Sequence, residues 1–295
     1  MLLHFYSAMP TNSIRSRPGI LIVVLFFGFC PVVAVRATSG WQTLAPGMDL
    51  KYVTAIKRSF VGDSKIVILR MEPSLWQLEA LGISQSGESS GHTARAWSQS
   101  RKLTAAINAG MFATDQKTHL GYMRSGEYVN NNRPNAYQSV AAFDPRNSTA
   151  LPRFRIFDLD APGITFQAIL KDYASVLQNL RLVKRPGLNQ WGEQDRKWSE
   201  AALGEDNAGR ILFIFSRSPF SMHDLNRELL AAGVGLVAAQ HLEGGPEAQL
   251  YVRVGAVELE MFGSYETAFL ENEGNSAAWP VPNILGVRPR ASGAH

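Results

Sequence analysis

A carboxylate followed by two glycines is the most chemically suggestive feature of the chain. Glu243 precedes Gly244 and Gly245, and then come Pro246 and a second carboxylate, Glu247. Adjacent glycines permit positive φ and let another molecule approach the main chain closely. Consecutive backbone N–H groups in such a turn can bind an anion. A carboxylate beside an anion-binding turn is typical of a catalytic loop, and a plain polar turn between two strands is the alternative.

An earlier segment shows a similar arrangement, in which an apolar run ends in a polar residue and a glycine. Residues 105–107 lead into Asn108 and Gly110, and Leu120-Gly121 follows. Asn108 has two open interpretations, because it could bind a substrate or hold the following loop. Gly110 suits a close approach to the backbone.

Two further polar residues are candidates for the same site. His119 lies next to Leu120-Gly121 and could act as a base, with a structural histidine as the alternative. Gln178 is comparable to Asn108 but has a weaker pattern around it. His241, on the apolar run that enters the Glu243 loop, could support that carboxylate from behind.

Taken in order, these segments resemble the phosphodiester glycosidase family. The resemblance covers about residues 50 to 290, and its specificity comes from the ordered set of motifs rather than from one of them. The matching stretches are Asn108-Ala109-Gly110-Met111-Phe112, Leu120-Gly121 with Arg124-Ser125-Gly126, Gln178 with Leu182-Val183, Ala202-Leu203-Gly204-Glu205-Asp206, and Leu242-Glu243-Gly244-Gly245.

The sequence departs from the family pattern at several positions. The family aspartate is Glu243 here, and the third glycine and the serine are replaced by Pro246 and Glu247. The family arginine falls near Glu200. Because Asn108 and the glycines are kept, these changes indicate a bacterial subgroup of the family.

The resemblance implies hydrolysis of a bond between sugar C1 and a phosphate oxygen. Such a site needs a carboxylate that activates water or attacks C1, and donors that stabilise the departing phosphate. Glu243 suits the first role, with loop support as its alternative. Arg124 or Lys197 could add positive charge, or could be surface cations. The predicted catalytic residues are Glu243 and Asn108, and the predicted substrate-binding residues are Gly110, Gly121, Gln178, Gly244, Gly245, Glu247 and His119.

Other kinds of site are not indicated. The histidines have no metal-ligand spacing, and no phosphate-binding or dinucleotide-binding glycine pattern is present, so no metal and no cofactor are predicted. A carbohydrate or sugar-phosphate substrate is the expected partner. The alternative function is a catalytically inactive protein of the same fold that binds a glycan or phosphate in the periplasm.

The first 37 residues have the pattern of a secretory signal peptide. Arg15 and Arg17 precede an apolar run over 19–35, and cleavage is predicted after Ala37. An uncleaved anchor is the alternative, but Pro31 and Arg36 shorten the run below the ~20 apolar residues of a membrane span. We therefore expect a periplasmic or secreted protein without stable membrane insertion after cleavage.

Composition sets further bounds on the mature chain. The formal net charge of +4 belongs mainly to the signal segment, because losing Arg15, Arg17 and Arg36 brings the 29 basic residues close to the 25 acidic ones. Nucleic acid is therefore not an expected partner. The one cysteine, Cys30, leaves with the signal, which excludes disulfides and a cysteine nucleophile.

The pattern of apolar runs predicts one α+β domain over residues 38–295, with a mixed β-sheet core and a few packed helices. We expect helices over 92–101, 166–176 and 222–232, the last beginning after Ser221. We expect strands over 65–70, 77–83, 103–107, 139–143, 153–159, 210–215, 235–239, 249–254, 256–261 and 283–287.

Overall fold

The computed structural model describes residues 40–147 and 150–291. The predicted signal peptide over 1–37 lies outside the described residues, so its cleavage and the boundary at residue 38 stay predictions. Within the described part of the chain, no helix has the length and apolar character needed to span a membrane.

The largest sheet has eight strands in the order β1-β2-β3-β14-β13-β15-β11-β12, and its pairings are antiparallel. Its middle is made by the long strands β13, β14 and β15, which carry part of the candidate site. The strand bounds are β1 (Gln42–Ala45), β2 (Met48–Thr54), β3 (Lys65–Met71), β11 (Arg181–Lys184), β12 (Leu188–Asn189), β13 (Trp198–Asp206), β14 (Ile211–Phe220) and β15 (Leu236–Gly244).

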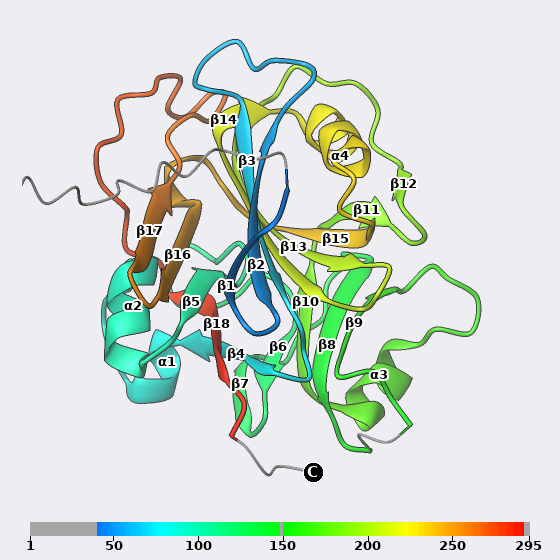
Figure 1. The fold of residues 1–295 in the computed structure, drawn as a ribbon. Coiled ribbons are helices and arrows are strands. Elements are labelled where there is room, and N and C mark those ends of the chain that lie inside the picture. Colours follow the sequence, from blue (N-terminus) through cyan, green and yellow to red (C-terminus); the bar gives the residue numbers. More distant parts are fainter. Residues whose placement is uncertain (1–39, 148–149, 292–295) are drawn as a thin grey trace, which may run out of the picture. The chain divides into compact units, whose positions relative to one another are not determined.

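Two further antiparallel sheets have five strands each, in the orders β7-β6-β10-β8-β9 and β17-β16-β5-β18-β4. Figure 1 shows the strands of the first of these sheets at the lower centre and right, and those of the second at the left. Their bounds are β4 (Trp76–Gly82), β5 (Ala105–Asn108), β6 (Met123–Ser125), β7 (Tyr128–Asn131), β8 (Ser139–Pro145), β9 (Phe154–Asp158), β10 (Tyr173–Asn179), β16 (Gln249–Val254), β17 (Val257–Phe262) and β18 (Asn283–Pro289).

The three sheets share one hydrophobic core. Alternate residues of a strand point to opposite faces, so Val67 and Leu69 of β3 enter the shared core while Ile66 and Ile68 face the other side of the sheet. Leu177 of β10 and Leu250 of β16 enter the shared core from the two smaller sheets. No sheet buries its inner face alone, so the described chain folds as one packed unit.

Four α-helices cover outer faces of the sheets in the described residues: α1 (Ile83–Ser86), α2 (Ala94–Arg101), α3 (Phe166–Asp172) and α4 (Met222–Ala231). The helix α4 begins where the Ser221 hydroxyl accepts a hydrogen bond from the Asp224 N–H at 3.1 Å. Leu225 and Leu229 on this helix pack against the outer face of the eight-stranded sheet. Figure 1 shows α4 beside β14 and β11.

The expected fold class is confirmed in part. A sheet core with a few packed helices is present, but the chain is rich in strand rather than clearly α+β, and the strand pairs of the described residues are antiparallel rather than mixed.

The expected helix over 166–176 is wrong over residues 173–176. The helix α3 ends at Asp172, and Tyr173 starts the strand β10. Val176 and Leu177 are fully buried in this strand, which pairs with β6 on one side and β8 on the other. A short apolar run of this kind cannot be told from a buried helix by its periodicity.

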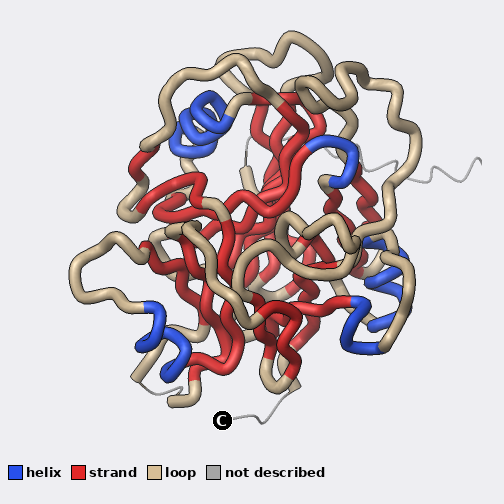
Figure 2. Tube along the Cα trace, turned by 180° about the vertical axis from the view of Figure 1, so that it is seen from behind, coloured by secondary structure: helices blue, strands red, loops and turns tan. Residues whose placement is uncertain are grey.

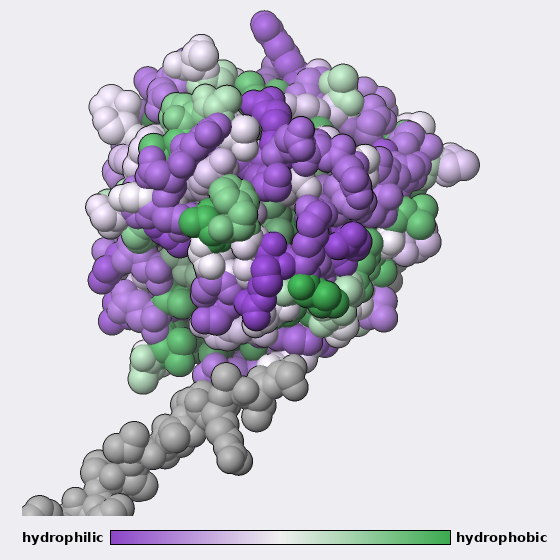
Figure 3. Space-filling view, turned by 90° about the horizontal axis from the view of Figure 1, so that it is seen from above, coloured by the Kyte–Doolittle hydropathy of each residue, from purple (hydrophilic) through white to green (hydrophobic). Residues whose placement is uncertain are grey.

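Polar residues dominate at least one face of the surface. Figure 3 shows that, seen from above, hydrophilic side chains predominate and apolar ones form small separate patches. Large exposed apolar side chains of the described residues include Phe60 and Phe269. Figure 2 shows long loops crossing in front of the strands when the molecule is seen from behind.

Candidate active site

Asn108 joins the end of β5 to the turn that follows Glu243. Its amide Nδ2 donates to the carbonyl of Glu247 at 2.9 Å, and its Oδ1 accepts from the N–H of Gln249 at 2.7 Å. Residues 245–247 form the short 3₁₀ turn η1 (Gly245–Glu247), so the two contacts lie at its last residue and just after it. Asn108 is buried and both of its polar atoms are engaged with backbone, so its observed contacts hold the turn in place.

Gln178, at the end of β10, holds a different loop. Its Nε2 donates to the carbonyls of Asn135 and Tyr137, and its Oε1 accepts from the N–H groups of Asn135 and Tyr122. Burial raises the pKa of Tyr137, and the nearby Glu243 raises it further. Gln178 is therefore linked to the Glu243 region through the 135–137 segment, while its own side chain is fully buried.

His119 belongs to a buried cluster under Gly110. Its Nδ1 accepts from the Gly121 N–H at 3.0 Å and its Nε2 donates to Asn179 Oδ1 at 3.1 Å. Burial lowers the pKa of His119, which favours the neutral ring. Asn179 Nδ2 donates to the carbonyl of Ala109 at 2.9 Å. These contacts fix the backbone that follows Asn108.

Two predicted substrate-binding glycines are explained by packing in this cluster. A Cβ on Gly110 would overlap Asn179 and His119, and a Cβ on Gly121 would overlap the carbonyl of Gln178. Hydrogen bonds thus join the end of β10 to the residue after β5, and the end of β5 to η1, which follows β15. Binding of substrate by these glycines stays a prediction.

Glu243 lies near the end of β15. Its Oε1 accepts a hydrogen bond from the Gly244 N–H at 3.1 Å. Burial raises its pKa to about 8, against the pull of His241 and of the Gly244 N–H, and the carboxylates of Glu247 and Glu266 add to the rise. The carboxyl of Glu243 is therefore mainly protonated at neutral pH.

Positive φ, which the Gly-Gly pair allows, occurs at only one of its glycines. Gly245 has φ of +61°, but Gly244 has φ of −118° and is extended. What restricts Gly244 is the indole of Trp198, because a Cβ there would lie 2.8 Å from Trp198 Cδ1. A Cβ on Gly245 would lie 2.5 Å from a carboxylate oxygen of Glu266.

A buried ion pair lies beside Glu243. His241 Nδ1 is 2.7 Å from Glu200 Oε1, and the Trp198 indole N–H donates to Glu200 Oε2 at 2.7 Å. Burial alone would lower the pKa of His241, but the Glu200 carboxylate raises it above its ordinary value. Glu200, an acid, thus stands near the position of the family arginine. The positive charge next to it belongs to His241.

Two more carboxylates complete the region. Glu247, in η1, is partly buried, and burial raises its pKa with a further contribution from Glu266. Glu266 follows β17, and the sequence reasoning did not identify it. Burial raises the pKa of Glu266, whereas Arg196 and His241 pull it down. No motif surrounds Glu266 in the sequence, so only the three-dimensional fold reveals its position.

The two cations considered from the sequence have other partners. Arg124 donates to the backbone carbonyls of Leu170, Tyr173 and Ala174 and so joins α3 to β10. Lys197 Nζ donates to the carbonyl of Asp195. Among the residues that the structure describes, no group of three or more His, Cys, Asp or Glu side chains could hold a metal ion.

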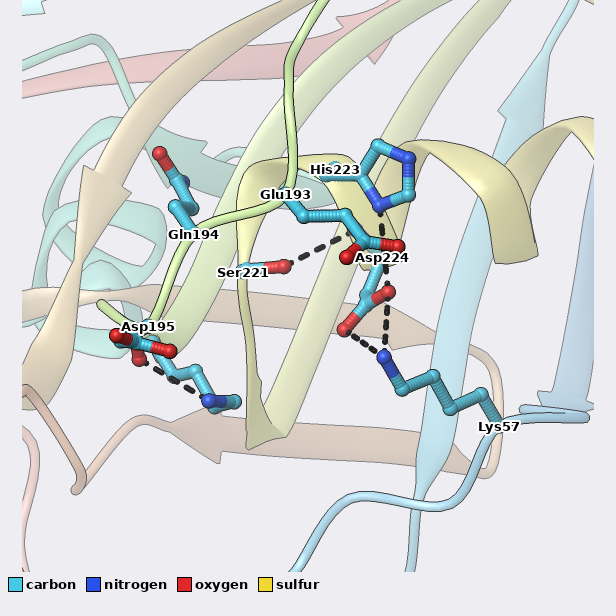
Figure 4. Close-up of a pocket in the computed structure, with 8 residues that line it drawn as sticks. Lys57, Glu193, Gln194, Asp195, Ser221, His223 and Asp224 are labelled. Carbon is cyan, nitrogen blue, oxygen red and sulfur yellow. Dashed lines mark hydrogen bonds and ion pairs between the residues drawn. The ribbon is translucent and has the colours of Figure 1, made fainter.

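A polar cavity of about 270 Å³ lies outside this region, and none of the predicted site residues lines it. Figure 4 shows its ion pair between Lys57 and Asp224, 2.7 Å apart, with His223 on the far side of the carboxylate. The lining residues are Lys57, Glu193, Gln194, Asp195, Lys197, Ser221, His223 and Asp224.

The protein combines an antiparallel three-sheet fold with a carboxyl group, that of Glu243, on a glycine turn. Its sequence matches the phosphodiester glycosidase family over residues 101–288, and the chain therefore belongs to that family. The matched stretch contains every predicted site residue. Comparison with curated protein sequences finds no significant match.

Solved structures share the fold at low sequence identity. The auto-inhibited catalytic domain of zebrafish N-acetylglucosamine-1-phosphodiester alpha-N-acetylglucosaminidase is similar with a TM-score of 0.59 and 12% identity, over 84% of this chain and 86% of that one. A hypothetical protein from Synechocystis has a TM-score of 0.54 and 13% identity, over 82% of this chain and 62% of that one. These similarities concern the fold alone.

Proposed function

We propose that the protein is a hydrolase that cleaves the bond between sugar C1 and the phosphate oxygen of a glycosyl-1-phosphodiester. Family membership supports the class of reaction. The observation that carries the proposal is Glu243, a carboxyl on the family's glycine turn whose pKa is raised to about 8.

The raised pKa suits an anionic substrate. An ionised carboxylate would repel a phosphodiester, whereas a protonated Glu243 can donate a hydrogen bond to a phosphate oxygen. As the C1–O bond breaks, the same proton can pass to the leaving phosphate. This assigns Glu243 a donor role, in place of the water-activating or nucleophilic carboxylate expected from the sequence.

The proposal includes export and a glycan substrate in the cell envelope or outside the cell. The basic and apolar pattern of residues 1–37 supports export. A periplasmic or secreted hydrolase would meet phosphodiester-linked sugars on surface glycans. The mass of the N-terminus of the protein purified from its host compartment tests cleavage after Ala37.

A second function is favoured by the charges around Glu243. Glu200 lies where the family arginine falls, and it is paired with His241, which leaves Arg196 as an outer cation near Glu266. A site with this arrangement of charges could bind a glycan without cleaving it. The second candidate is therefore a glycan-binding or phosphate-binding protein of the same fold.

A panel of synthetic glycosyl-1-phosphodiesters, with different sugars and with alkyl or aryl esters, separates the two functions. Purified protein from residue 38 onward is incubated with each compound, and free sugar and phosphate monoester are measured, with calorimetry for binding. The proposal expects equal release of the two products from at least one compound. Binding without release of sugar across the panel would support the second function.

A further inference from the structure

Glu266 reaches the Glu243 turn from a distant part of the chain. It lies between β17 and β18, and an isolated bridge pairs it with Trp198, the first residue of β13. Its N–H donates to the carbonyl of Leu270 at 2.9 Å, and the N–H of Leu270 donates back at 3.0 Å. The backbone of Glu266 is therefore held from two sides.

The side chain of Glu266 lies directly over Gly245. Its carboxylate oxygen and its Cβ are the nearest atoms to the place where a side chain at residue 245 would begin, at 2.5 and 3.1 Å. The absence of a side chain at Gly245 thus makes room for this carboxylate. Glu266 is partly exposed, so water can reach it.

The charged groups that interact with Glu266 come from β15, from η1 and from the segment before β13. Glu243 and His241 belong to β15, Glu247 belongs to η1, and Arg196 lies just before β13. Both cations of this set act on Glu266, since Arg196 and His241 each favour its ionised form. Among the residues that the structure describes, no cation lowers the pKa of Glu247 in the same way. Glu266 is thus better placed than Glu247 to carry a negative charge.

We propose that Glu266 is the second catalytic carboxylate and acts as the base, with Glu243 as the acid, an inference that rests on the proposed function. A water oxygen bonds to sugar C1 while the bond from C1 to the phosphate oxygen breaks. The water proton passes to Glu266, and the Glu243 proton passes to the leaving phosphate. The products are a free sugar and a phosphate monoester, and no redox partner is needed.

Replacing Glu266 or Glu243 by glutamine distinguishes the role of the base from that of the acid. Glu266→Gln should lower kcat on the phosphodiester by about 100-fold or more, because it removes general-base assistance. Sodium azide should restore turnover of this variant and give a glycosyl azide, since azide attacks C1 without a base. Glu127→Gln, in the exposed turn between β6 and β7, is the matched control and should behave as the unmodified protein.

A glycosyl fluoride tests the division of roles, because fluoride leaves without a proton donor. Glu243→Gln should retain most of its turnover of the fluoride, while Glu266→Gln should not. Turnover of the phosphodiester by Glu266→Gln at the level of the Glu127→Gln control would overturn the proposal. The proposal would also be overturned if Glu243→Gln lost turnover of the fluoride while Glu266→Gln kept it.

The electrostatic pairing of the Glu243 and Glu266 carboxyl groups can also be measured without catalysis. In ¹³C NMR of glutamate-labelled protein, Glu266→Gln should lower the titration midpoint of the Glu243 carboxyl, because a neighbouring negative charge is lost. An unchanged midpoint would overturn the pairing. If the unmodified protein releases no sugar from any phosphodiester, the proposed function and the catalytic role of Glu266 both fail, and the titration alone decides the pairing.

Discussion

Among single residues, the protonation state of Glu243 decides which chemistry the candidate site can perform. Glu243 is surrounded by other carboxylates and partly removed from water, and both conditions favour its neutral form. His241 opposes them but is itself paired with Glu200. The neighbourhood of Glu243, rather than the residue type, determines which chemistry this carboxyl can perform.

The first prediction concerns the pH dependence of hydrolysis. If the protonated Glu243 is the active form, kcat/KM should fall as pH rises through about 8, the pKa to which its surroundings raise this carboxyl. A pH–rate profile of the unmodified protein measures this, with the same profile for Glu127→Gln as a control. A rate that increases through this range would show that the ionised carboxylate is the active form.

The second prediction concerns stability. The pKa of Glu243 is raised from 4.5 to about 8 on folding, so between these values the folded state holds a proton that the unfolded state has released. The free energy of unfolding should therefore fall by about 1.4 kcal/mol per pH unit from this group. The contribution of the Glu243 carboxyl to the free energy of unfolding is fully present below pH 4.5 and is lost by about pH 8.

Urea denaturation at several pH values in this range measures the slope. The variant Glu243→Gln has no carboxyl to titrate, so its slope should be smaller by this amount and it should gain stability over the unmodified protein as pH rises. Parallel curves for the two proteins would show that the pKa of Glu243 is not raised in the folded state.

At the level of the elements, the candidate site lies where β5, β10 and β15 end. Asn108 ties η1 to β5, Gln178 ties the 135–137 segment to β10, and Asn179 ties Ala109 to the same strand. These side chains contact backbone atoms of the loops. Their role in the structure is to set the loop geometry around Glu243.

The third prediction uses two glycines that share a backbone conformation. Gly245 and Gly255 have φ of +61° and +56°, but only Gly245 has a carboxylate against it, and nothing lies within 4 Å of a Cβ at Gly255. Either glycine replaced by alanine should cost about 1–2 kcal/mol of backbone strain. Only Gly245→Ala should also displace Glu266.

Thermal denaturation and hydrolysis assays of the two variants test this. Similar losses of stability are expected, with a large loss of activity for Gly245→Ala and activity close to that of the unmodified protein for Gly255→Ala. Equal activity of both variants would mean that the position of Glu266 over Gly245 has no part in catalysis.

The elements also show where sequence reasoning succeeds and where it fails. The strand over 249–254 was expected with the bounds that β16 has, because its apolar and β-branched residues stand between clear turn residues. The strand β13 was not expected, since its Ser-Glu-Ala-Ala-Leu-Gly stretch has little intrinsic preference for strand. Pairing with β14 and β15 determines its conformation instead.

In the candidate site, too, local sequence patterns predict some residues and miss those that depend on tertiary contacts. Glu243, Asn108 and the glycine turn could be found from local motifs, because their residue types and spacing follow a pattern. Glu266 could not, since its partners Gly245 and Trp198 are distant in sequence and their contact depends on the path of the segment after β17.

At the scale of the whole molecule, the three sheets depend on one another. Phe213 of β14 is fully buried in the core that all three share. The fourth prediction is that Phe213→Ala lowers the free energy of unfolding by about 3–5 kcal/mol. Unfolding should stay a single transition, because no sheet has a separate inner core.

Near-ultraviolet circular dichroism and tryptophan fluorescence, followed through the same urea titration, check the fourth prediction. Coincident curves for the variant and for the unmodified protein are expected. Two separate transitions would indicate that one of the sheets unfolds independently of the others.

The claim that Glu243 supplies the proton for glycosyl-phosphodiester hydrolysis is tested most directly by kcat of Glu243→Gln on a phosphodiester that the unmodified protein cleaves. The amide keeps the size of the side chain and removes the transferable proton. We expect a fall of about 100-fold or more in a variant that stays folded by circular dichroism. Turnover close to that of the unmodified protein would contradict it.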